Sequence, residues 1–312
     1  MTLLQDRQPS VRDATAYLAG KRRRNSRLSR RLSIAGALIL GASVSFAQPV
    51  PPTGIVENPC QSAAPAPASP EMAALFKMMM KPGPLDPQVM AKLRAPVAPA
   101  DARAQEEQQQ HDWPNLCRYR AENAALAGGP RPRAIFMGDS ITEFWGMADP
   151  SLFSNGIIDR GISGQTSPQM LLRFYADVIA LRPRVVHILA GTNDLAGNTG
   201  PTTVQDYKNN IRAMCDLAAV HGIKVILGSI PPAGAFPWRP GIKPAAQIIA
   251  LNSWMRDYAA AHHLQFVDYH SALSASDGSM RADLTHDGIH PHSAGYALMR
   301  PLAEQAVMNA LK

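Results

Sequence analysis

The chain has 312 residues, of which 31 are Lys or Arg and 24 are Asp or Glu, so its formal charge is +7. A basic chain of this size suggests nucleic acid or an acidic membrane surface as a partner. The distribution of the charge argues against a nucleic-acid-binding body, because residues 1–47 carry nine basic and two acidic residues and the rest carries 22 of each.

The first 47 residues have the order of an export signal. A basic segment, 21–31, precedes an uncharged apolar run, 34–46, and small residues at Ser45 and Ala47 suit signal peptidase. The run is shorter than the roughly 20 residues of a membrane span, so we expect cleavage near Ala47 and a periplasmic or secreted protein. Ser29-Arg30-Arg31 resembles a twin-arginine signal. The Sec route and an uncleaved anchor stay open as alternatives.

Three cysteines follow this segment, at Cys60, Cys117 and Cys215. An exported protein folds in an oxidising compartment, where a disulfide is stable. Cys60 and Cys117 both precede the periodic part of the chain, and we predict that they pair. Cys215 lies in an apolar helical pattern and is predicted to be a buried free thiol.

Residues 48–110 differ in composition from the rest, with 12 of the 27 prolines and one aromatic residue, Phe76. The runs 61–70 and 95–104 are predicted to form an extended linker. Residues 71–80 have helical propensity, and both a short docked helix and a weakly ordered apolar turn remain open.

From residue 111 to 312 the pattern predicts one α/β domain, in which short apolar runs typical of buried parallel strands alternate with longer helical patterns. The predicted strands are 133–137, 157–159, 185–190, 224–229 and 265–268. The predicted helices are 113–123, 167–181, 203–221, 244–262 and 292–311. This alternation indicates a parallel sheet covered by helices on both faces, with a site at the carboxyl ends of the strands.

Polar and glycine-rich segments follow these predicted strands. They are Gly138–Thr142, Arg160–Gln165, Gly191–Asp194 and, in a later loop, Asp287–Pro291. Because the carboxyl ends of parallel strands share one edge of the sheet, we expect the four segments to meet there.

Their side chains suggest nucleophilic catalysis. Ser140 on a tight turn is a candidate nucleophile, His290 a base that takes its proton, and Asp287 the group that orients the base. A tetrahedral intermediate also needs donors for its oxygen, and the Ser140 N–H, the Gly164 N–H and the Asn193 amide are candidates.

The four segments resemble the blocks of the SGNH, or GDSL, hydrolase family. Its blocks correspond to Gly138-Asp139-Ser140, Gly164, Gly191–Asp194 and Asp287-x-x-His290. The resemblance covers about residues 111–312. It implies a three-layer α/β/α sandwich with a five-stranded parallel sheet of order 2-1-3-4-5, and ester hydrolysis without a metal or another cofactor.

Several nearby groups have structural interpretations. Asp139 is predicted to stabilise the turn at Ser140, and Asp194 to accept hydrogen bonds from the same loop. His187 is predicted to be a satisfied core histidine. A zinc site is disfavoured because the triad uses His290 and no Cys or carboxylate cluster completes the set. The groups weighed for zinc are His286, His290, His292, Asp283 and Asp287.

The loop 231–244 follows a predicted strand and carries Phe236, Trp238 and Arg239. Together with Trp145 these residues are candidates for the substrate-binding wall, since loops at this edge shape pockets. Packing of the same side chains against the domain is the alternative.

The sequence thus predicts an exported serine esterase for short-chain, acetyl-type esters, with acetylated carbohydrate as a natural substrate. That substrate follows only by fold analogy. A lysophospholipase or thioesterase acting on lipid, and a non-catalytic domain that binds esters or carbohydrate, are the alternatives. No nucleic-acid partner and no membrane span of the mature form are expected.

Overall fold

The computed structural model describes residues 54–61, 70–95 and 99–312. The predicted signal segment, 1–47, lies outside the described residues. All of the described residues belong to one compact unit of the chain, 51–312.

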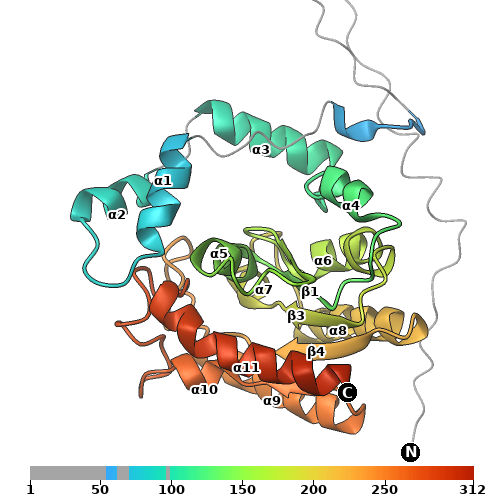
Figure 1. Ribbon diagram of the computed structural model, residues 1–312. Helices are drawn as coiled ribbons and strands as arrows, with labels where there is room; N and C mark the ends of the chain where they lie inside the picture. Colours follow the sequence, from blue (N-terminus) through green and yellow to red (C-terminus); the bar gives the residue numbers. More distant parts are fainter. Residues whose placement is uncertain (1–53, 62–69, 96–98) are drawn as a thin grey trace, which may run out of the picture. The chain divides into compact units, whose positions relative to one another are not determined.

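A single parallel sheet forms the centre of the domain, between layers of helices (Figure 1). Within the described residues it has five strands, in the order β2-β1-β3-β4-β5. The strands are β1 (Ala134–Gly138), β2 (Ile157–Gly161), β3 (Val185–Leu189), β4 (Lys224–Gly228) and β5 (Gln265–Val267). All five predicted strands are present, within two residues of the predicted ends. The predicted strand order is confirmed as well.

Helices cover both faces of this sheet because alternate strand residues point to opposite sides. On one face, Ile135, Val186 and Val225 pack with α6 (Ser167–Phe174), α8 (Val204–Val220) and α9 (Ala245–Ala261). On the other face, Phe136 and Ile226 pack with α5 (Ser140–Ala148), α10 (Tyr269–Leu273) and α11 (Ser293–Leu311). The three-layer α/β/α sandwich implied by the family resemblance is confirmed.

The segment before the domain is more helical than its composition predicts. It contains η1 (Pro59–Gln61), α1 (Pro70–Met79), α2 (Pro87–Arg94) and α3 (Pro99–His111). The expectation of an extended linker over 95–104 is therefore wrong for α3. Proline starts α1, α2 and α3, where its missing N–H costs nothing. Ala, Gln and Glu then favour helix along 100–110.

Two other helix predictions differ from the structure. Only α4 (Arg120–Leu126) is helical in the predicted helix 113–123, because the Asp112 carboxylate instead accepts the N–H groups of Leu116 and Cys117, both at 2.8 Å. The predicted helix 167–181 consists of α6 followed by a π-helical turn, η2 (Tyr175–Ile179).

Candidate active site

Ser140 is the first residue of α5 and follows β1 after a tight turn. The Asp139 side chain caps this helix by accepting the Ile141 N–H at 2.9 Å, which confirms the predicted role of Asp139 in the turn. Gly138 has no room for a side chain, since a Cβ would lie 2.0 Å from Thr142 Oγ1. The turn therefore holds the Ser140 hydroxyl at the carboxyl end of β1, beside the central strand β3.

His290 reaches this hydroxyl from a loop that follows α10. Its Nε2 lies 2.8 Å from Ser140 Oγ, and its Nδ1 lies 2.6 Å from Asp287 Oδ2. The second carboxylate oxygen of Asp287 accepts the backbone N–H groups of Ile289 at 2.9 Å and His290 at 2.8 Å. The structure thus brings the three predicted triad residues into one hydrogen-bonded chain.

Within this hydrogen-bonded triad, the environment favours the protonated form of His290 and the ionised form of Asp287. Burial lowers the pKa of His290, but the charge and hydrogen bond of Asp287 outweigh it, so that the pKa is raised above its ordinary value of 6.5. Burial raises the pKa of Asp287, yet His290 and the backbone donors lower it well below its usual range. Asp287 is therefore ionised at neutral pH and can stabilise an imidazolium.

The two other predicted oxyanion residues lie on the loop after β2 and on α7 (Thr192–Ala196), after β3. Gly164 has φ +78°, a left-handed conformation that a side chain would strain. The Asn193 Nδ2 donates to Gln165 O at 3.0 Å and to Asp139 Oδ2 at 3.3 Å. In the part of the chain that the structure describes, the N–H groups of Ser140 and Gly164 have no protein acceptor.

A buried arginine that the sequence reasoning missed ties two of these loops together. Arg173 of α6 donates to Gly138 O at 3.0 Å and to Arg160 O at 2.8 Å, the carbonyls beside the ends of β1 and β2. It also donates to Gln165 Oε1 at 2.5 Å and pairs with Asp177 at 2.8 Å. Its signal in the sequence is a charged residue between Met170 and Phe174 on the apolar side of the helix.

Among the hydrogen bonds of the described residues, Asp194 accepts none from the loop of Ser140, so that part of the prediction is wrong. Its carboxylate accepts the Ser167 N–H at 3.0 Å and the Ser167 hydroxyl at 2.5 Å, at the start of α6. Asp194 is still a structural acceptor, but it fixes α6 against α7. Because it is buried, its pKa is raised, although the bonds from Ser167 oppose the shift.

The four predicted substrate-binding residues separate into two groups. Trp145 and Phe236 have exposed fractions of 0% and 1% and pack in the core, so the structure does not support them as a substrate wall. Trp145 stacks on Tyr296 with 5.5 Å between ring centroids. Trp238 is 41% exposed, and its Nε1 donates to Asn198 Oδ1 at 2.9 Å. Arg239 is exposed and donates to Gly197 O at 3.4 Å.

The helix α1 and the two residues after it contact α5, the loop that carries the triad histidine and the start of α11. Phe76 packs on Phe144 with ring centroids 5.0 Å apart, and Phe144 packs on His290 at the same distance. The carbonyl of Lys81 accepts a hydrogen bond from His286 Nε2 at 2.8 Å, and that of Met80 accepts the Ser293 N–H at 2.9 Å. A short docked helix, one of the two alternatives for 71–80, is therefore what the structure shows.

The disulfide and the other cysteine agree with the sequence prediction. Cys60 and Cys117 form a disulfide with a Cα–Cα distance of 5.4 Å. Cys215 is free and buried, and burial raises the pKa of its thiol to about 12. The disulfide ties η1 to the turn that precedes α4.

His187 is fully buried, as predicted, but it is only half satisfied. Its Nε2 lies 2.9 Å from the Tyr269 hydroxyl, while its Nδ1 has no hydrogen-bond partner in the described part of the chain. Burial lowers the pKa of His187 to about 3. It therefore stays neutral at the pH at which the candidate triad would work.

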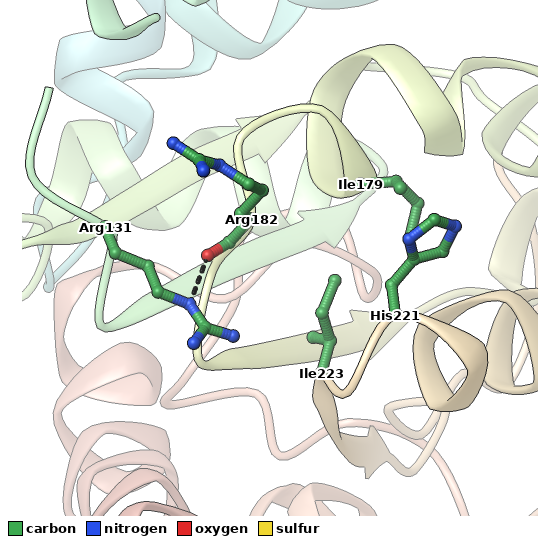
Figure 2. A pocket seen from close by; sticks show the side chains of 5 residues that line it. All are labelled: Arg131, Ile179, Arg182, His221 and Ile223. Atoms are coloured by element: carbon green, nitrogen blue, oxygen red, sulfur yellow. Dashed lines mark hydrogen bonds between the residues drawn. The ribbon is translucent and has the colours of Figure 1, made fainter. Parts of the chain in front are cut away.

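Two clefts lie outside the triad. One of about 300 Å³ is bordered by α7 and includes Asp194, Tyr207 and Ile242. The other, of about 340 Å³, is lined by Arg131, Ile179, Arg182, His221 and Ile223 (Figure 2). These residues precede β1, β3 and β4, so the cleft lies at the amino ends of the strands, at the opposite edge of the sheet from Ser140. In that cleft Arg131 Nε donates to the Arg182 carbonyl at 2.6 Å, and the position excludes it as part of the triad site.

Two kinds of feature are absent from the described residues. No group of three or more His, Cys, Asp or Glu residues converges in a way that could hold a metal ion. None of the described helices combines the length and the apolar character needed to cross a bilayer.

Comparison with known proteins supports the assignment of the fold. The model of the GDSL-like Lipase/Acylhydrolase family matches residues 136–298. A GDSL-like lipase from Bacteroides thetaiotaomicron is 45% identical, with a TM-score of 0.62, over 64% of this chain and 100% of its own. An acylhydrolase-like protein from Bacteroides fragilis is 46% identical, with a TM-score of 0.62, over 64% of this chain and 99% of its own.

One curated protein also matches, over a short stretch. The uncharacterized lipoprotein YqeF of Bacillus subtilis is 38% identical over 79 residues, which are 24% of this chain. The match spans 32% of the length of that protein, about a third.

Proposed function

Because the chain belongs to the GDSL-like lipase/acylhydrolase family of ester hydrolases, we propose that it is an exported serine esterase for short-chain, acetyl-type esters. The observation that carries the proposal is the hydrogen-bonded chain from Ser140 through His290 to Asp287. A nucleophile, a base and an orienting carboxylate in contact are the arrangement that acyl transfer needs.

The first half of the reaction forms an acyl-enzyme. Ser140 Oγ attacks the ester carbonyl carbon while His290 Nε2 takes the hydroxyl proton. The carbonyl oxygen becomes an oxyanion, for which the N–H groups of Ser140 and Gly164 and the Asn193 amide are donors. When the intermediate collapses, the bond to the alcohol oxygen breaks, and His290 returns its proton to the leaving alcohol.

The second half releases the acyl group. A water molecule attacks the acyl-serine carbonyl, and His290 takes a proton from it. Collapse of the second intermediate breaks the bond to Ser140 Oγ, which recovers its proton from His290. Asp287 keeps Nδ1 of the imidazole protonated in the resting state and stabilises the imidazolium in both halves. No metal or other cofactor enters the reaction.

The exposed face of Trp238 at the edge of the site suggests the class of substrate. The partly exposed Trp238 offers an aromatic face of the kind that packs on sugar rings, next to Asn198, which contacts Asn193. Acetylated carbohydrate therefore remains the proposed substrate. Export is proposed from residues 1–47 of the sequence, and the lipoprotein name of YqeF agrees with it.

An acyl-chain series of p-nitrophenyl esters, run beside Ser140→Ala, tests the proposal. We expect the highest kcat/KM with acetate, loss of activity in the variant and no effect of a chelator. A preference for long chains would favour the lipid-hydrolase alternative. A folded wild-type protein inactive on every ester would favour a binding domain, and inhibition by a chelator would favour a metal.

A further inference from the structure

Asn198 contacts the two segments that carry the proposed oxyanion donors Asn193 and Gly164. Its Nδ2 donates to Asn193 Oδ1 at 2.7 Å and lies 3.4 Å from the Gly164 carbonyl oxygen. Its backbone N–H also donates to the Asn193 carbonyl, at 3.1 Å. A single side chain therefore connects the loop after β2 to α7, and it is not part of the four sequence blocks.

Trp238 determines which way the Asn198 amide points. The indole Nε1–H donates to Asn198 Oδ1 at 2.9 Å. An indole N–H can only donate, so the amide oxygen of Asn198 has to face the tryptophan and its NH2 group has to face Asn193. The indole N–H of Trp238, which cannot accept, thus sets the orientation of the Asn198 amide.

The orientation of the Asn198 amide in turn fixes the orientation of the Asn193 amide. Because Asn193 Oδ1 accepts from Asn198, its Nδ2 faces the other side, where Gln165 O and Asp139 Oδ2 are both acceptors. The reversed Asn193 amide would place oxygen against oxygen on that side and NH2 against NH2 at Asn198. The donor at Trp238 therefore selects one of two nearly isosteric orientations of the amide.

We propose that Asn198, anchored by Trp238, is a positioning residue that keeps the NH2 group of Asn193 on the side of Asp139, the neighbour of Ser140. There the longer of its two bonds, 3.3 Å to Asp139 Oδ2, is exchanged for a bond to the developing oxyanion. The inference rests on the proposed esterase function, because it assigns a role to residues behind the oxyanion donor. Such donors act by being oriented before the charge forms. Loss of the anchor should therefore lower kcat and leave substrate binding in the ground state almost unchanged.

Asn198→Asp tests the direction of the hydrogen bonds. The carboxylate can still accept from Trp238, but it has no hydrogen for Asn193 Oδ1 and repels that oxygen. Removing a whole oxyanion donor costs about 10²–10³ in kcat, so a misdirected donor should cost roughly 10- to 100-fold on p-nitrophenyl acetate, with little change in KM. Asn209→Asp, on the exposed surface of α8, introduces the same charge and should have no effect.

Trp238→Phe tests the anchor without removing the aromatic face. The ring that could contact substrate is kept and the N–H is lost, so we expect a smaller fall in kcat, about 3- to 10-fold, at constant KM. Trp254→Phe, on α9, is the matched control with the same chemical change. Trp238→Phe also tests the proposal if Asn198→Asp fails to fold.

Affinity for phenylboronic acid supplies a measurement apart from turnover, because the boronate forms a tetrahedral adduct on a nucleophilic serine. We expect Asn198→Asp to weaken this binding by about the factor lost in kcat. A folded Asn198→Asp with wild-type kcat and boronate affinity, or with a change in KM alone, would overturn the positioning role. A wild-type protein that neither hydrolyses esters nor binds the boronate would instead contradict the esterase function itself.

Discussion

Nε2 of His290 lies 2.8 Å from the hydroxyl oxygen of Ser140, although 150 positions separate the two residues. The contact depends on two turns at one edge of the sheet. One is the tight turn after β1, and the other is the loop in which Asp287 accepts the backbone N–H groups of Ile289 and His290. Since Asp287 also bonds Nδ1, the free lone pair of the neutral imidazole faces the serine.

Replacing either partner of this contact should abolish esterase activity. Ser140→Ala removes the nucleophile and His290→Ala removes the base. Each should lower kcat on p-nitrophenyl acetate by roughly 10⁴-fold or more, and the double variant should be no worse than the single ones, because the groups act as a unit. Initial rates with purified variants measure this.

The control for these variants is the thermal transition. The Ser140 hydroxyl is hydrogen-bonded to His290, so the Tm of Ser140→Ala should change by only a few degrees. His290→Ala also removes the bond to Asp287 and should lower Tm further. A Ser140→Ala variant that keeps full activity with an unchanged Tm would show that the nucleophile lies elsewhere.

The pH dependence of kcat/KM should reflect the raised pKa of His290. The base accepts a proton only when it is neutral, so activity should be lost as the pH falls through an apparent pKa above 6.5. Asp139 is buried, which raises its own pKa to about 7, and its charge contributes to the raised pKa of His290. The charges of the two groups interact, so the measured value belongs to the pair.

Two substitutions separate these contributions. Asp139→Asn keeps the helix cap and removes the charge, so the midpoint of the pH profile should move to lower pH. Asp287→Asn should move it further and also lower kcat by about 10⁴-fold, since the tautomer of His290 is no longer fixed. A midpoint that is the same in all three proteins would contradict this account of the His290 pKa.

The strands and the triad could be predicted from the sequence because each rests on local signals, whereas the order of the strands came from the resemblance to the SGNH family. Apolar runs mark the buried strands, and polar turns after them mark the edge where the site lies. Ser140, Asp287 and His290 could be identified because the four segments appear in the same order as the blocks of the SGNH family. The same signals place Gly164, whose positive φ requires glycine.

The remaining features depend on contacts between distant residues. Asn198 and Trp238 are 40 positions apart, and neither residue type nor spacing predicts their hydrogen bond. Trp145 was assigned to the substrate wall because it lies close to Ser140 in sequence, but its position on α5 turns it into the core. The high proline content of residues 48–110 led to the prediction of an extended linker, although proline at the first turn is compatible with a helix.

The contact of α1 with Phe144 of α5 predicts that Phe76 supports the site. Phe76→Ala leaves space beside Phe144, which in turn packs on His290. Because Phe76 is only partly buried, we expect a loss of about 1–3 kcal/mol in the free energy of unfolding, measured in urea, together with a few-fold lower kcat.

Lys77→Ala is the matched control for this prediction. Lys77 is exposed on the same helix, so the variant should have wild-type stability and activity. Wild-type kcat in Phe76→Ala at a temperature where both proteins are folded would show that α1 does not support the position of His290.

Removal of the disulfide should lower stability more than activity. The Cys60–Cys117 bond closes a loop of 57 residues, and the entropy that it takes from the unfolded chain corresponds to about 4 kcal/mol. We expect Cys60→Ser/Cys117→Ser to unfold at clearly lower urea than the oxidised wild type. The triad residues lie on other loops, so kcat below the transition should change by less than a factor of about three. A reductant should shift the wild-type transition and leave that of the double variant unchanged. Equal urea midpoints for the oxidised wild type and the double variant would contradict a stabilising role for the bond.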